Sequence, residues 1–282
     1  MDKKRREFLK IAGISTLAGL GGTAVIDRLA TGASPARARA AYEINSLSPA
    51  GQPKEKGPAK AAAKTSQRLG LVIDMRKFNA NPGLAEKCIK TCDFLHNIPH
   101  FNNKKDEVKW VWLTGYENAF QEHSQYYRNE TIEKNQVLLL CNQCDDPPCV
   151  RACPTKATFK AKNGIVAQDY HRCIGCRFCM AACPYGSRSF NWRDPRGGLD
   201  MKHINPEYPT RMRGVVEKCT MCVERVGIGK LPACVEATGD TKAMIFGDLN
   251  DANSEIRKFL KENYTIQRKP SLGTHPSVFY IV

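Results

Sequence analysis

The sequence predicts an α+β fold built from small cysteine-bearing modules. Three observations lead to this expectation. Apolar runs are short, as at residues 71–75, 108–113 and 137–140; expected helices are short apart from one over residues 253–262; and thirteen cysteines are concentrated between residues 88 and 234. A chain of 282 residues is long enough for one large domain or two small ones. The cysteines therefore need a chemical explanation.

The first forty residues match a twin-arginine export signal. Residues 4–10 read Lys-Arg-Arg-Glu-Phe-Leu-Lys, and the mildly apolar stretch 11–26 that follows is too short to span a membrane stably. Residues 38–40, Ala-Arg-Ala, offer a cleavage site, so we expect the mature chain to begin at Ala41 and to be periplasmic. The alternatives are an N-terminal amphipathic or anchoring helix and an uncleaved signal that holds the chain on the membrane.

The plainest cysteine motif lies in residues 173–184 and reads Cys-x2-Cys-x2-Cys-x3-Cys-Pro. Residues 141–154 repeat it with a longer loop, as Cys-x2-Cys-x4-Cys-x3-Cys-Pro. Such runs bind [4Fe-4S] clusters in pairs, and the fourth cysteine of each run ligates the other cluster. Two clusters are predicted: cluster 1 on Cys141, Cys144, Cys149 and Cys183, and cluster 2 on Cys153, Cys173, Cys176 and Cys179.

Zinc and disulfides are the alternatives for these eight cysteines. Zinc ribbons use paired Cys-x2-Cys knuckles rather than this run. Disulfides would be strained between three cysteines on one tight loop. The export signal agrees with clusters, because the twin-arginine route carries folded proteins, whereas unfolded thiols would oxidise after export.

The negative charge of bound clusters would balance most of the net charge of +15. Beyond residue 40 the chain holds 35 Lys and Arg against 25 Asp and Glu, a charge of +10. Each cluster with four thiolates adds about −2, so three clusters leave about +4. Nucleic-acid binding, the other common reason for a basic chain, is therefore not expected.

The remaining cysteines form two incomplete motifs. Cys219-x2-Cys222-x11-Cys234 has Thr238 where a fourth ligand belongs, and Cys88-x3-Cys92 stands alone. Residues 92–99 read Cys-Asp-Phe-Leu-His-Asn-Ile-Pro, and together with the cysteine motifs they extend a family resemblance over residues 71–247. This stretch resembles the four-motif, double-ferredoxin electron-transfer subunits of membrane and molybdenum oxidoreductases.

That resemblance implies a third cluster, because the family pairs its first motif with its fourth. Cluster 3 would be held by Cys92, Cys219, Cys222 and Cys234. The losses at Thr238 and before Cys88 then fall on a single fourth site, and Cys88 is expected to be an unliganded buried thiol. The alternative is a fourth cluster held by Cys88, Thr238 and oxygen or imidazole donors such as His96.

The resemblance also implies the domain organisation. After the signal (1–40) and a flexible linker (41–69), a degenerate outer ferredoxin-like module (70–140 and 197–250) retains one cluster. A central bacterial-ferredoxin-like dicluster module (141–196) holds two, with loop-rich insertions. Within it, residues 158–160 and 165–167 flank Asn163-Gly164, a hairpin signal. Residues 251–282 are expected to form a helix and an extended tail that lies on another surface.

Several stretches resemble the periplasmic iron–sulfur subunits of Dsr-type membrane complexes of sulfur-metabolising prokaryotes. They are residues 155–159, 170–176, 185–195, 214–219 and 247–251. This implies electron transfer between a quinone-reactive integral membrane subunit and a periplasmic multihaem cytochrome c, with membrane association through these partners. The alternative is the electron-transfer subunit of a periplasmic molybdopterin oxidoreductase acting on polysulfide, thiosulfate or tetrathionate. We expect no catalysis by the chain itself, since no nucleophile–base pair or phosphate loop stands out.

A group of basic residues surrounds the two central motifs. Two interpretations are open: they tune the clusters or dock an acidic partner, or they balance the negative charge of the clusters. The residues are Arg151, Lys156, Arg172, Arg177, Arg188 and Arg193.

Overall fold

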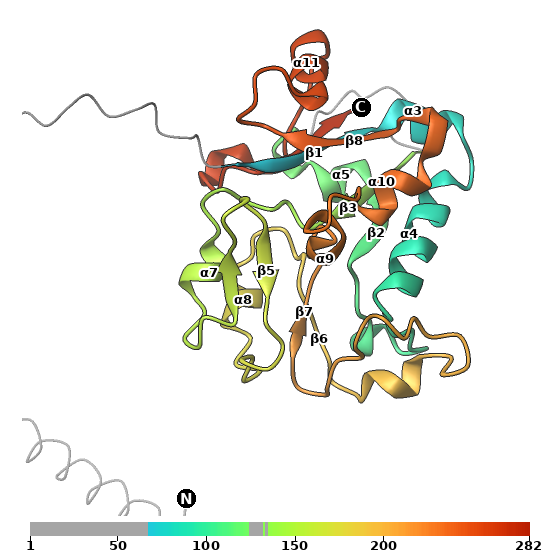
Figure 1. Cartoon of the computed structure of the whole chain (residues 1–282), viewed down its shortest axis with the longest axis vertical. Helices are drawn as coiled ribbons and strands as arrows, with labels where there is room; N and C mark the ends of the chain where they lie inside the picture. The colour runs from blue at the N-terminus through green and yellow to red at the C-terminus, as the bar shows by residue number, and fades with distance from the viewer. Residues whose placement is uncertain (1–66, 124–131, 133–134) are drawn as a thin grey trace, which may run out of the picture. The chain divides into compact units, whose positions relative to one another are not determined.

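The computed structural model describes residues 67–123, 132 and 135–282, so the predicted export signal and nearly all of the predicted linker lie outside it (Figure 1). The described part mixes short helices with four small sheets, in agreement with the α+β expectation. Its α-helices are α3 (Met75–Ala80), α4 (Leu84–Leu95), α5 (Tyr116–Ala119), α7 (Pro148–Arg151), α8 (Phe178–Ala181), α9 (Val223–Val226), α10 (Ala233–Ala237) and α11 (Glu255–Glu262). Its strands are β1 (Leu69–Asp74), β2 (Val111–Gly115), β3 (Gln136–Leu140), β4 (Thr158–Lys160), β5 (Val166–Gln168), β6 (Ser189–Phe190), β7 (Val216–Glu217), β8 (Met244–Asp248) and β9 (Val278–Ile281).

The largest sheet has the order β8-β1-β9, and β1 is buried along its whole length. β8 runs antiparallel and β9 parallel to β1. Because side chains alternate across a strand, Leu71 and Ile73 enter the main core while Val72 packs under α11 with Ile256. Figure 1 shows α11 on the outer side of this sheet.

The C-terminal tail differs from expectation. It is extended, but it pairs with β1 of its own chain instead of reaching a separate surface. Val278 and Tyr280 are fully buried in the main core, so their apolar side chains explain why the segment is drawn into this sheet.

The sequence locates the local elements well. The predicted hairpin is confirmed as β4 and β5, joined through a turn in which Gly164 adopts a φ of +82°. α11 begins after Ser254, whose hydroxyl accepts a hydrogen bond from the Arg257 N–H. β3 follows its expected range and pairs with β2, which begins three residues later than expected, at Val111.

The longest described helix, α4, is not among the expected elements. It has 12 residues and packs against α10, far along the chain. Its only fully buried side chains are Cys88 and Cys92, because residues four apart lie on the same helix face. Among the residues that the structure describes, no helix is long and apolar enough to cross a membrane.

Candidate iron–sulfur sites

The four cysteines predicted for cluster 1 line a single cavity. Strand β3 leads directly into Cys141, Cys149 lies on α7, and Cys183 follows α8. Burial raises the pKa of Cys144 to about 12, with a further contribution from the negative charge of Cys141, although a hydrogen bond with Thr274 opposes it. The structure thus places these four cysteines around one cavity.

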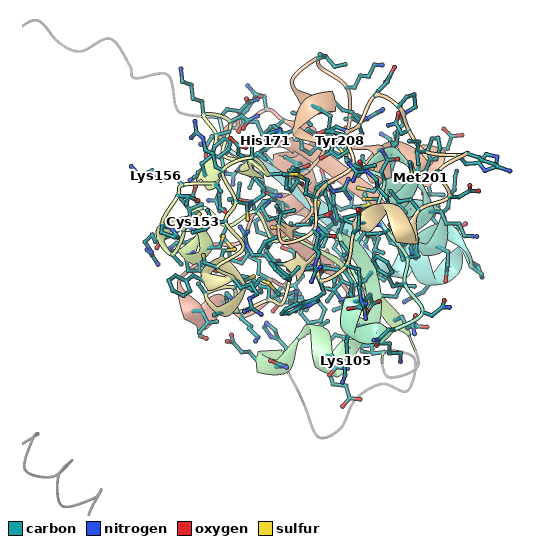
Figure 2. The ribbon with its side chains drawn as sticks, turned by 90° about the horizontal axis from the view of Figure 1, so that it is seen from below. Lys105, Cys153, Lys156, His171, Met201 and Tyr208 are labelled. Atoms are coloured by element: carbon teal, nitrogen blue, oxygen red, sulfur yellow. The ribbon has the colours of Figure 1, made fainter. Side chains whose placement is uncertain are left out.

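The residues predicted for cluster 2 come together around α8. Burial raises the pKa of Cys179, Arg188 lowers it, and the charges of nearby thiols, including Cys173 and Cys153, raise it again. Cys179 lies on α8, and Cys176 lies between it and Cys173 in the sequence. In Figure 2, Cys153 lies toward one edge of the described residues.

The loop of cluster 2 needs glycine at one position. Gly175 has a φ of +72°, and a Cβ there would lie 2.3 Å from the carbonyl oxygen of Gly214. The close approach of these two segments continues at β7, where the Val216 N–H donates to Cys173 Sγ at 3.5 Å. Backbone donors of this kind stabilise a thiolate ligand.

Cluster 3 draws its predicted ligands from distant segments. Cys92 lies on α4, Cys234 on α10, and Cys219 and Cys222 on the loop before α9. Burial raises the pKa of Cys92 well above its usual range, and the charges of Cys219, Cys234 and Cys222 raise it further. Two N–H groups, of Met221 and Ala233, donate to Cys219 Sγ and Cys222 Sγ at 3.4 Å each.

These donor sets fit [4Fe-4S] clusters better than zinc or disulfides. All thirteen cysteines lie in the described residues and are free thiols. Thiolates around one Zn²⁺ at about 2.3 Å would stand about 3.8 Å apart. Among the described His, Cys, Asp and Glu residues, the one group with three ligand atoms within 4.8 Å is His96, Cys222 and Glu224, which holds a single cysteine. The cysteines of each group are therefore spaced more widely than ligands of a single zinc ion, which suits a [4Fe-4S] core because that core is larger than one ion.

Cys88 and Thr238 both donate hydrogen bonds to backbone carbonyls. The Cys88 thiol is fully buried and donates to the Cys234 carbonyl at 3.4 Å. Burial raises the pKa of Cys88 to about 11. The Thr238 hydroxyl donates to the Val235 carbonyl of its own helix at 2.7 Å. These bonds give no support to a fourth cluster on Cys88, Thr238 and His96.

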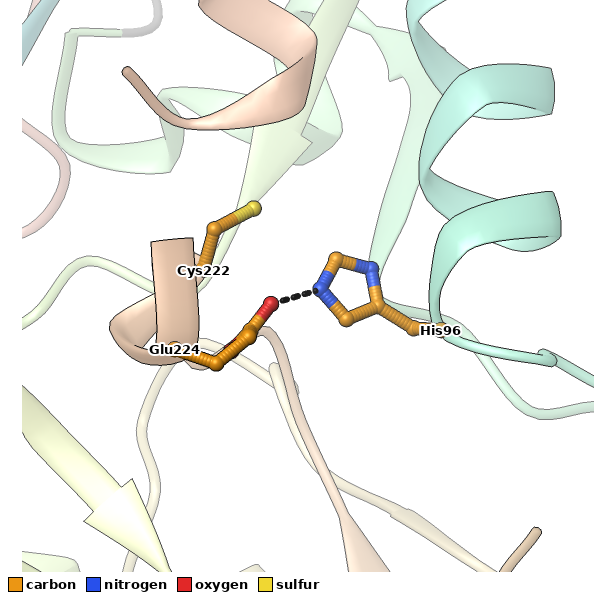
Figure 3. Close-up of side chains that lie close together, drawn as sticks. All are labelled: His96, Cys222 and Glu224. Carbon is orange, nitrogen blue, oxygen red and sulfur yellow. Dashed lines mark hydrogen bonds and ion pairs between the residues drawn. The ribbon is translucent and has the colours of Figure 1, made fainter. Parts of the chain in front are cut away.

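His96 lies directly after α4, against cluster 3 (Figure 3). Its Nδ1 is 3.0 Å from the Cys92 carbonyl oxygen and 3.5 Å from Cys92 Sγ, and its Nε2 is 2.9 Å from Glu224 Oε1. The imidazole ring therefore holds Cys92 in place while Glu224 orients the ring from α9. The sequence pattern did not predict a role for Glu224 or for Lys218, which is buried. The only signal in the sequence for Lys218 is its position directly before Cys219.

The sequence matches known iron–sulfur proteins. A family model for the 4Fe-4S dicluster domain matches residues 135–196. The chain is 45% identical over 203 residues to the "Hdr-like menaquinol oxidoreductase iron-sulfur subunit 1" of Archaeoglobus fulgidus, covering 68% of this chain and 71% of that protein.

Two further relatives extend the match. Identity is 37% over 239 residues to the "Menaquinone reductase, iron-sulfur cluster-binding subunit" of Nitratidesulfovibrio vulgaris, covering 76% of this chain and 88% of the relative. It is 33% over 231 residues to a tetrathionate reductase subunit of Salmonella typhimurium, covering 79% and 76%. With a dicluster domain and relatives matched over most of their length, the protein belongs to the 4Fe-4S dicluster ferredoxin-like family of iron–sulfur subunits.

Proposed function

We propose that this chain is an electron-transfer subunit that holds three [4Fe-4S] clusters and catalyses no reaction of its own. When bound, such clusters each accept and release one electron. The observation that carries the proposal is that eleven of the thirteen cysteines gather into three groups, to which the motif spacing adds Cys176 as a twelfth member. Their members are Cys141, Cys144, Cys149 and Cys183; Cys153, Cys173, Cys176 and Cys179; and Cys92, Cys219, Cys222 and Cys234.

We infer the spatial order 2-1-3 for the three groups, because Cys149 and Cys179 belong to one packed hydrophobic cluster and Cys141 and Cys219 to another. Cys179 of cluster 2 is close enough to Cys149 of cluster 1 for the charge of one to raise the pKa of the other. After burial, the charge of Cys141 in cluster 1 is the largest influence that raises the pKa of Cys219 in cluster 3. We infer a linear electron relay, with cluster 1 in the middle.

Cluster 2 is the end of the relay that we assign to an external partner. Three of its four cysteines are partly exposed, whereas all four of cluster 3 are buried. Two large apolar side chains on its loop, Ile174 and Phe178, are 67% and 61% exposed. Exposed apolar groups beside a redox centre suit a protein contact that excludes water.

The finer identity that we propose is a DsrO-type subunit of a Dsr membrane complex, exported by the twin-arginine route to the periplasm. Its partners would be a quinone-reactive integral membrane subunit and a periplasmic multihaem cytochrome c. The stretches at residues 170–176 and 185–195 support this identity, and the menaquinol and menaquinone relatives support the quinone link.

A second candidate is the electron-transfer subunit of a periplasmic molybdopterin oxidoreductase. The relative named as a tetrathionate reductase subunit favours it. The two candidates differ in what the chain delivers electrons to, a cytochrome or a molybdenum subunit.

Two measurements test these proposals. Iron and acid-labile sulfide in the anaerobically purified protein should each approach about twelve atoms per chain. About sixteen would argue for a fourth cluster, and zinc without sulfide would end the electron-transfer proposal.

For the partners, the affinity-tagged native complex is analysed for haem c and molybdenum. Haem c without molybdenum supports the Dsr-type complex, and molybdopterin supports the second candidate.

A further inference from the structure

Arg188 and Lys218 are buried basic residues that each lie beside more than one cysteine group and have no carboxylate partner among the described residues. Arg188 is 6% exposed and Lys218 is fully buried. Arg188 Nη1 donates to Thr158 Oγ1 and Gln168 Oε1, both at 3.2 Å. Lys218 Nζ donates to the carbonyl oxygens of Val166 and Cys219. A buried charge is costly unless something nearby compensates it, so both residues call for an anionic neighbour.

Another buried basic residue, Arg211, is compensated by a carboxylate. Arg211 is also nearly fully buried, but its Nη2 lies 2.8 Å from Glu217 Oε2, and both side chains are inaccessible to solvent. At this position the chain pairs a buried guanidinium with a carboxylate. Arg268, which is also buried, instead donates to the carbonyl oxygens of Ala119 and Tyr185. The charges that compensate Arg188 and Lys218 must be of another kind.

Arg188 lies between the cluster 1 and cluster 2 sites. It lines the same cavity as Cys141 and Cys149 of cluster 1. Burial lowers its pKa, but the charges of Cys149, Cys179 and Cys141 outweigh that and raise it, so thiolates of both clusters act on one guanidinium. Its Nη2 is buried and has no hydrogen-bond partner within the described part of the chain, which leaves a donor free for a sulfur acceptor.

Lys218 lies between the cluster 1 and cluster 3 sites. It directly precedes Cys219 and donates to the carbonyl oxygen of that residue at 2.9 Å. Val166, whose carbonyl oxygen accepts from Lys218, lines the cluster 1 cavity. Each junction of the 2-1-3 relay therefore holds one buried cation.

We propose that Arg188 and Lys218 are the fixed countercharges of the two junctions, and that each raises the reduction potentials of the two clusters beside it. The inference rests on the proposed three-cluster assignment. One-electron reduction makes a cluster more negative, and a nearby cation in a poorly screened interior favours that change. Cluster 1 is stabilised in its reduced form from both sides, and each outer cluster from one side.

The test is an EPR-monitored redox titration of the purified mature protein. Each signal is first assigned by its loss in Cys144→Ser, Cys179→Ser or Cys234→Ser. In Arg188→Met we expect the reduction equilibrium constants of clusters 1 and 2 to fall at least tenfold, a shift of about 59 mV for one electron, with cluster 3 unchanged. Lys218→Met should shift clusters 1 and 3 by a similar factor and leave cluster 2 unchanged.

Two controls separate charge from packing. Arg188→Lys keeps the charge and should keep both potentials near the wild-type values. Arg172→Met removes a cation next to Cys173 in sequence, but that side chain is 66% exposed and lies 3.3 Å from Asp169, so solvent screening predicts no resolved shift. If Arg188→Met does not assemble its clusters, Arg188→Gln replaces it, because an amide still donates toward Thr158 and Gln168.

Several outcomes would overturn the inference. They are unmoved potentials in both neutral variants, an equal shift of all three clusters, or a fall in Arg188→Lys as large as in Arg188→Met. Wild-type protein with twelve irons but unmoved variants would refute this inference alone. Wild-type protein without iron and sulfide would instead refute the proposed function.

Discussion

Two cysteines one helical turn apart should respond oppositely to the same substitution. Cys88 and Cys92 both lie on α4 and are both buried, at 0% and 4% exposure. The charges of Cys219, Cys222 and Cys234 all act on Cys92, whereas Cys88 acts on Cys234 alone among these three and its thiol donates to the Cys234 carbonyl. Cys92→Ala therefore removes a cluster ligand, and Cys88→Ala, its matched control, removes only a small buried side chain.

The expected magnitudes follow from this difference. Loss of one cubane lowers the iron content from about twelve to about eight atoms per chain. Cys88→Ala keeps about twelve and costs on the order of 1 kcal/mol of folding free energy, for one buried sulfur and a weak hydrogen bond. Iron, labile sulfide and the EPR spin count after dithionite reduction are measured on both anaerobically purified variants.

Either of two results would contradict the reasoning. Loss of four irons in Cys88→Ala would make Cys88 a ligand and revive the fourth cluster. Twelve irons in Cys92→Ala would remove Cys92 from cluster 3. The signals of clusters 1 and 2 report whether each variant has folded, so that a loss at cluster 3 alone is not confused with general misfolding.

Three further predictions concern the core, the cluster 2 loop and export. Arg211→Met leaves a carboxylate buried without its partner and should cost about 3–5 kcal/mol in denaturant unfolding; adding Glu217→Gln should recover most of that loss, and additive effects would contradict the pairing. Gly175→Ala brings a Cβ within 2.3 Å of a carbonyl oxygen at a φ of +72° and should lower iron toward about eight, whereas full occupancy would refute that clash. Arg5→Lys with Arg6→Lys should keep the chain out of the periplasm in cell fractionation, and normal export would exclude the twin-arginine route.

Elements determined by neighbouring residues were accessible from the sequence. The β4–β5 hairpin follows from Asn163-Gly164 between two short apolar runs, and α11 from a serine cap before an amphipathic stretch. The family and its cluster type follow from cysteine spacing, because the ligand loop is a local structure.

Elements that depend on distant partners were missed or misplaced. α4 carries many polar residues, and its helix is stabilised by packing on α10, nearly 140 residues later. The tail was expected on another surface, and it becomes β9 because β1 has an open edge for a parallel strand. Burial of Arg188 and Lys218 is equally invisible in sequence, where both look like ordinary surface charges.

The sequence by itself therefore determined the chemistry of this protein: the ligand type, the spacing of the two central motifs and the membership of an iron–sulfur family. The resemblance of the sequence to a known family also assigned Cys92, and not Cys88, to the third group. Only the tertiary structure showed that the Cys88 thiol donates to a carbonyl and that Arg188 and Lys218 are buried beside the cysteine groups. The physical reason is the separation along the chain between the residues that interact. A ligand loop closes over a few residues, whereas the neighbours of a buried charge are set by how whole segments pack.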